Sequence, residues 1–114
     1  MVYLGEYEMR SLPVLALSNE AVSANTLICE LSGGIQNNDV TFLSMQCNFS
    51  SAGKLYLVFE NGSTMYLTDP NNDWPASYQI LTTAMVPKGE TVGLYYSADA
   101  TLGKLIVVMG GSVF

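Results

Sequence analysis

Short runs of β-forming residues recur along this chain at close intervals, and they constrain its fold more than any other feature. The runs are rich in Val, Ile, Thr, Tyr and Phe, and clusters of Gly, Pro, Asn, Asp and Ser separate them. They cover residues 14–17, 21–31, 40–49, 55–60, 64–68, 78–86, 91–97 and 105–109. About eight short strands with turns between them predict an all-β antiparallel sandwich, jelly-roll-like or immunoglobulin-like. The one helix candidate, residues 19–25, is short and is expected to form no more than a turn.

The strongest local signal is a hairpin over residues 55–68. Residues 55–60 and 63–68 flank Asn61-Gly62, and this pair supplies the positive φ values of a type I′ turn. We therefore expect a two-residue turn with paired strands on both sides.

Alternation along the strands predicts which side chains are buried, because successive residues of a strand point to opposite faces. The core residues predicted in this way are Leu43, Met45, Cys47, Leu55, Leu57, Phe59, Leu67, Leu94, Ile106 and Val108. Residues 105–109 are apolar on both faces, so this run should be a central strand or one whose outer face meets another subunit.

The chain is poor in charge. Charged residues make up 12%, hydrophobic residues 49%, and the mean hydropathy is +0.27. A chain of 114 residues forms one domain with much of its sequence on the surface, so apolar side chains would be exposed unless neighbouring subunits covered them. We expect a homo-oligomer, with a trimer favoured, or a subunit of a larger assembly. The alternative is a soluble monomer with a surface rich in Ser, Thr and Asn.

Several function classes are disfavoured. The net charge is −6 with only four basic residues, which argues against nucleic acid and anionic membranes as partners. The absence of histidine removes Ser-His-Asp and Cys-His pairs and the usual general base, so we expect no enzyme and no cofactor. The first residues do not resemble a signal peptide, because Glu6, Glu8 and Arg10 interrupt them.

The two cysteines, Cys29 and Cys47, lack the spacing of a metal or redox motif. Both lie in apolar runs, where a free thiol behaves as a small hydrophobic side chain. Two buried reduced thiols are expected, and a single disulfide between adjacent strands remains the alternative.

Residues 69–75 form the most suggestive polar stretch. Asp69, Asn71 and Asp73 alternate as in the opening of a calcium loop, but Trp74 and Ile80 stand where that loop needs Gly and Glu, so a turn built by Asx side chains is favoured and no metal is expected. An aromatic ring beside amides and carboxylates also suits a sugar. The candidate binding residues are Asn71, Asp73, Trp74 and Tyr78.

Residues 1–12 resemble an arm or edge strand more than a core strand, and residues 13–114 form the sandwich domain. An arm of this kind would pair with a sheet edge or lie across a neighbouring subunit. Together with the final strand, it provides the candidate interface residues Val2, Tyr3, Leu4, Tyr7, Met9, Ile106 and Met109.

An acidic, histidine-free all-β chain with the arm of residues 1–12 and the apolar strand 105–109 resembles the small accessory proteins of tailed-bacteriophage particles. The resemblance is closest to capsid decoration or cement proteins, and it implies a structural role in a virion, trimerisation and contact with a capsid protein. It carries no functional residue over to this chain. Such a protein would be made in the host cytoplasm. The alternative is a carbohydrate- or receptor-binding module of phage-tail or adhesin type.

Overall fold

The computed structural model of the chain describes residues 10–32, 40–87 and 89–111. Its strands in chain order are β1 (Arg10–Val22), β2 (Thr26–Ser32), β3 (Val40–Phe49), β4 (Leu55–Val58), β5 (Thr64–Tyr66), β6 (Ile80–Pro87), β7 (Thr91–Tyr96) and β8 (Ala100–Gly111). The described ranges contain no helix. The all-β class expected from the sequence is therefore confirmed.

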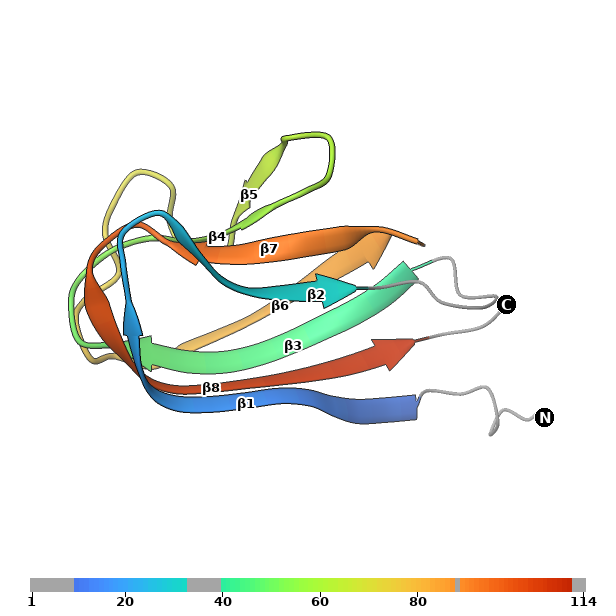
Figure 1. Ribbon diagram of the computed structural model, residues 1–114, viewed down its shortest axis with the longest axis horizontal. Helices are drawn as coiled ribbons and strands as arrows, with labels where there is room; N and C mark the ends of the chain where they lie inside the picture. Colours follow the sequence, from blue (N-terminus) through green and yellow to red (C-terminus); the bar gives the residue numbers. More distant parts are fainter. Residues whose placement is uncertain (1–9, 33–39, 88, 112–114) are drawn as a thin grey trace.

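The strands form two layers (Figure 1). Sheet A has the strand order β1-β8-β3-β6, and sheet B has the order β2-β7-β4-β5. Every pair of neighbouring strands is antiparallel. The two sheets pack against each other around a shared core, which makes the fold an antiparallel sandwich, as predicted. The edge strands are β1 and β6 in sheet A and β2 and β5 in sheet B.

The core lies between the sheets and follows the predicted alternation in most strands. Predicted core residues that are buried are Met45, Cys47, Leu55, Leu57 and Leu94. Predicted core residues that are half-buried but pack against the core are Phe59 and Leu67. The side chain of Leu43 lies outside the described residues.

The prediction for β8 placed the wrong side chains in the core. Leu105 and Val107 are fully buried, whereas Ile106 and Val108 are half-buried and point to the outer face of sheet A. The strand is apolar on both faces, so alternation gave no indication of which set faces inward. Its position between β1 and β3 agrees with the central strand that was one of the two expectations.

The predicted hairpin joins β4 to β5, with Leu57 opposite Met65. Its turn differs from the type I′ turn that we expected. Gly62 has a φ of 88°, but Asn61 is not among the described residues with positive φ. The Phe59 N–H donates to the Ser63 carbonyl at 2.8 Å, so the connection contains three residues and ends in a left-handed glycine. The Asn61 side chain accepts a hydrogen bond from the Ser63 N–H at 2.9 Å, which favours this longer turn.

The run predicted over residues 21–31 is two strand segments. β1 ends at Val22 and β2 begins at Thr26. Asn25, with a φ of 55°, lies in the turn between them, and its N–H donates to the Tyr96 carbonyl. The turn contains neither Gly nor Pro, which is why composition did not reveal it.

Candidate interaction surface

The outer face of sheet A carries an uncharged surface built by β3, β6 and β8. Its residues alternate with buried ones along each strand and therefore point away from sheet B. We define the neutral face by the residues Ser44, Gln46, Leu81, Thr83, Met85, Ile106 and Val108. Leu81 is 69% exposed and Met85 is 53% exposed. Apolar side chains grouped on one face in this way are typical of an interaction site.

Strand register brings these residues together in rows across the sheet. Gln46 lies opposite Ile106 on one side and Leu81 on the other. Ser44 lies opposite Val108 and Thr83 in the same way. The rows border a shallow hollow of about 460 Å³, and the residues that line it are Ser44, Met45, Gln46, Leu81, Thr82, Thr83, Ile106 and Val108. No lining residue is charged, so the hollow suits an apolar or neutral polar partner surface.

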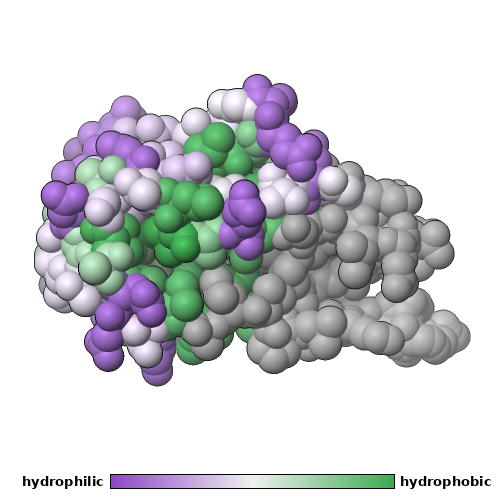
Figure 2. All heavy atoms as spheres, in the orientation of Figure 1, coloured by the Kyte–Doolittle hydropathy of each residue, from purple (hydrophilic) through white to green (hydrophobic). Residues whose placement is uncertain are grey.

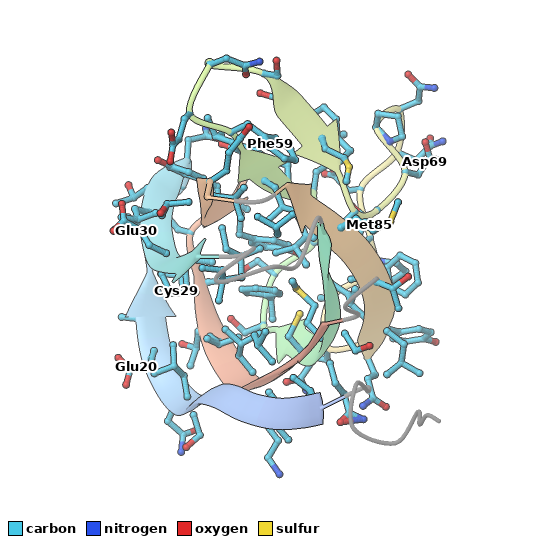
Figure 3. The ribbon with its side chains drawn as sticks, turned by 90° about the vertical axis from the view of Figure 1, so that its right-hand side faces the viewer. Glu20, Cys29, Glu30, Phe59, Asp69 and Met85 are labelled. Atoms are coloured by element: carbon cyan, nitrogen blue, oxygen red, sulfur yellow. The ribbon has the colours of Figure 1, made fainter. Side chains whose placement is uncertain are left out.

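The charges of the described part lie elsewhere. The acidic residues with described side chains are Glu20, Glu30, Glu60, Asp69, Asp73, Glu90 and Asp99, and none is on the neutral face. In Figure 3, Met85 lies beside β6 on one side of the sandwich, while Glu20 and Glu30 lie on the opposite side. Lys104 of β8 is exposed and lies two residues from Ile106, so a cation borders the neutral face.

The space-filling view shows a different side of the molecule, where the hydrophobic residues gather in the middle of the described part (Figure 2). Hydrophilic residues lie around them. The apolar character of the composition is thus visible at the surface as well as in the core.

Sheet B presents an aromatic row on its outer face. Leu27, Tyr95, Tyr56 and Tyr66 lie opposite one another across β2, β7, β4 and β5. The rings of Tyr56 and Tyr95 stack with centroids 5.5 Å apart, and Tyr66 is tilted against Tyr56 at the same distance. Burial raises the pKa of Tyr56, and Tyr66 and Tyr95 raise it further. The Tyr56 hydroxyl donates to Asn25 at 2.7 Å. Tyr66, at the edge of the row, is 45% exposed.

The predicted sugar-binding residues lie together in the loop between β5 and β6, but Trp74 is already engaged. Its side chain is half-buried and packs against the core. The indole N–H donates to the Tyr78 carbonyl at 3.1 Å. The Trp74 N–H donates to the Gly53 carbonyl at 2.7 Å, and the Gly53 N–H donates to the Trp74 carbonyl at 3.2 Å. These contacts hold Trp74 in place within the loop. Tyr78 is 66% exposed, and it contacts Trp74 through the Tyr78 main-chain carbonyl.

The carboxylates of this loop also have partners. Asp73 forms an ion pair with Lys54 at 2.6 Å, between side chains that are 53% and 25% exposed. Asp69 accepts hydrogen bonds from the Asn71 N–H at 2.8 Å and from the Asn72 amide at 3.0 Å. This is the Asx turn that the sequence favoured over a calcium loop. Within the described ranges, no three or more His, Cys, Asp or Glu side chains gather to hold a metal.

Most of the predicted interface residues cannot be placed. Val2, Tyr3, Leu4, Tyr7 and Met9 lie outside the described residues, and so does the side chain of Met109. Ile106 is half-buried on the neutral face.

The two cysteines are free thiols that come from different sheets. Cys47 of β3 is buried as expected, whereas Cys29 of β2 is only half-buried, so the expectation of two buried thiols was wrong for Cys29. Burial raises the pKa of Cys29 to about 11. Burial, together with the nearby Cys29, raises the pKa of Cys47 to about 12. A thiol with a raised pKa is protonated at neutral pH and is a poor nucleophile.

Sequence reasoning recognised β6 as a strand but missed its contribution to the surface. Leu81, Thr83 and Met85 point outward, while the alternate residues Ile80, Ala84 and Val86 are buried. The signal was present, because residues 80–87 contain no charge and carry apolar side chains on both faces.

Comparison with known proteins gives no family assignment, since neither the family models nor the curated proteins match this chain. Within the described ranges, no helix is long and apolar enough to cross a membrane.

Proposed function

We propose that this chain is a non-enzymatic structural subunit of a virion or a comparable assembly, of the capsid decoration or cement type. In this proposal it is held in place by its neutral face. The observation that carries the proposal is that face itself, where Leu81 and Met85 are largely exposed beside an uncharged hollow. A surface of this kind is stabilised when a partner covers it, because burial removes apolar area from water at about 25 cal/mol per Å².

The charge distribution supports the same role. The chain carries a net charge of −6, and like-charged subunits repel each other. The neutral face keeps the described carboxylates away from the contact, so a neighbouring subunit can approach there with little electrostatic cost.

The alternative function, a carbohydrate- or receptor-binding module, depends on Trp74 being free to stack on a ligand. Its indole packs against the core and its N–H is used within the loop. Asp73 is paired with Lys54. These contacts favour a structural role for the loop over a binding role.

The proposal is tested by following the chain in lysate of the organism that produces it, separated by sedimentation. We expect the chain to migrate with large particles. Ser44→Lys and Ile106→Lys, which place a cation on the neutral face, should each lower the particle-bound fraction about tenfold. Thr64→Lys, at an exposed position on sheet B, is the matched control and should bind normally.

A glycan array with the purified chain tests the alternative. We expect no specific binding, and Trp74→Ala should only destabilise the fold. Specific glycan binding that Trp74→Ala abolishes, together with normal incorporation of Ser44→Lys, would contradict the structural proposal.

A further inference from the structure

The free edge of β6 differs from the other three sheet edges in lacking the usual protection against pairing. Natural edge strands are kept from pairing by charged residues, proline, bulges or short length. β1 contains Arg10, Pro13 and Glu20 and has a register shift. β2 contains Glu30 and a register shift, and β5 has three residues.

β6 has eight residues, and its sequence ILTTAMVP contains no charge. Its register with β3 is unbroken from Ile80 to Pro87, so the strand has no bulge along its length. Within the described residues it pairs with β3 alone. Only Pro87, at its last position, cannot donate a backbone hydrogen bond. The strand therefore presents a row of backbone donors and acceptors that a further strand can pair with.

We propose that β6 pairs antiparallel with β6 of a second copy of this chain, so that the two copies of sheet A form one continuous sheet. This inference deepens the proposed function by naming a partner and a mode of contact. A second copy fits better than an unrelated strand because β6 is complementary to itself. An uncharged strand is also where two chains of net charge −6 repel each other least.

The faces of the strand determine the register. Residues opposite each other in an antiparallel pair lie on the same face. Leu81, Thr83 and Met85 point outward, so an outward residue must meet an outward residue of the second copy. With the twofold axis at Thr83, each Leu81 lies opposite Met85 of the other copy and the two Thr83 residues face each other. This register brings the two exposed apolar side chains of each strand into lateral contact across the pair, and Thr–Thr pairs are themselves favourable across strands.

An antiparallel pairing of identical strands is isologous and closes at two copies. The inference therefore predicts a dimer, or an assembly built from dimers. The trimer expected from the sequence would need a different contact. The outer faces of both copies lie on the same side of the continuous sheet, so the neutral faces would form one larger surface toward a third partner.

A charge-swap experiment tests this register. Sedimentation velocity of the unsubstituted chain, over a series of concentrations, should show a species of twice the 12.3 kDa chain mass. Thr83→Lys and Thr83→Glu should each raise the dissociation constant about tenfold, because like charges then face each other at the axis. An equimolar mixture of the two variants should restore dimerisation to about the unsubstituted level. Thr83 is exposed, so both variants should keep the melting temperature of the parent.

Ser44→Lys is the matched control, since Ser44 lies opposite Thr83 on β3, is exposed, and is one strand away from the edge. It should leave the dimer intact. The inference would be overturned by a monomer at every concentration or by a trimer. It would also be overturned by a dimer that Ser44→Lys breaks and that the Thr83 mixture fails to restore. None of these results would contradict the proposed function, because that function is tested separately by the particle binding of Ser44→Lys.

Discussion

The ring of Phe49 stacks on the ring of Tyr96, with centroids 3.8 Å apart and planes inclined by 5°. Phe49 ends β3 in sheet A, and Tyr96 ends β7 in sheet B, so the stack joins the two sheets across the core. Both rings are buried, and the Tyr96 hydroxyl donates to the Ser51 carbonyl at 2.6 Å. Burial raises the pKa of this hydroxyl to about 12, with smaller contributions from Asp73 and Cys47. The contact fixes the end of the sandwich near the Trp74 loop.

Removal of the Tyr96 hydroxyl should destabilise the fold while leaving the stack in place. Tyr96→Phe loses one hydrogen bond to a main-chain carbonyl, which costs about 1 kcal/mol. Tyr95→Phe is the control, because this neighbouring residue is only half-buried and should change the free energy of unfolding by less than about 0.5 kcal/mol. Urea unfolding of the three proteins checks the prediction, and equal effects of the two substitutions would contradict it.

Gly53 should not tolerate a side chain. A Cβ atom there would lie 2.8 Å from two ring atoms of Tyr96 and 3.1 Å from the Ser97 hydroxyl. Gly53→Ala should therefore lower the free energy of unfolding by about 1–3 kcal/mol through overpacking. If the ring is the cause, the double variant Gly53→Ala/Tyr96→Leu should be less unstable than the sum of the single variants. Strict additivity would indicate another cause.

The Asx turn at Asp69 should contribute stability that depends on pH. The hydrogen bond from the Asn72 side chain, followed by that from the Asn71 N–H, lowers the pKa of Asp69 from its ordinary value of 3.8. A lowered pKa in the folded state means that stability is present above pH 3.8 and is lost as the pH falls through the folded pKa. Asp69→Ala should lower the melting temperature at about pH 6, and the difference should shrink toward about pH 2. A difference that is independent of pH would contradict this role.

The two thiols should react slowly in the folded protein, and Cys47 more slowly than Cys29. With pKa values raised to about 11 and about 12, Cys29 and Cys47 are protonated at pH 8, which slows their reaction with a thiol reagent. Cys47 is buried, so it should be labelled only as fast as the protein opens, and half-buried Cys29 should be labelled faster than Cys47. Because both pKa values are higher in the folded state than the ordinary value of 9.0, the thiols contribute to the free energy of unfolding. This contribution is fully present below pH 9.0 and is lost as the pH rises through the pKa values of the folded state. Mass spectrometry of labelled protein, with and without denaturant, checks this. Rapid labelling of Cys47 without denaturant would contradict its burial.

Sequence patterns predicted the parts of the fold that depend on local information. The alternation in β3 identified Met45 and Cys47 as core residues, and Asn61-Gly62 located the hairpin. The turn type was missed because it depends on which backbone groups pair, and Phe59 pairs with Ser63.

The candidate surface needed long-range information. Ile106 and Leu105 are both apolar, so only the packing of sheet B on sheet A decides which of them is buried. In the same way, residues 80–87 were recognisable as a strand, but their position at a sheet edge depends on pairing with the distant residues of β3. Nothing local distinguishes an edge strand from a central one when both are apolar on two faces.

Oxidation of Met85 tests most directly whether the neutral face is covered in the native assembly. Met85 is 53% exposed in the isolated chain, whereas Met45 on the neighbouring strand is 3% exposed and serves as the internal reference. Hydrogen peroxide converts exposed methionine to the sulfoxide, and peptide mass spectrometry measures the rate at each position. The proposal predicts that Met85 oxidises much faster than Met45 in the isolated chain and slows about tenfold or more in the particle-bound fraction. An unchanged rate at Met85 in that fraction would contradict the claim that a partner covers this face.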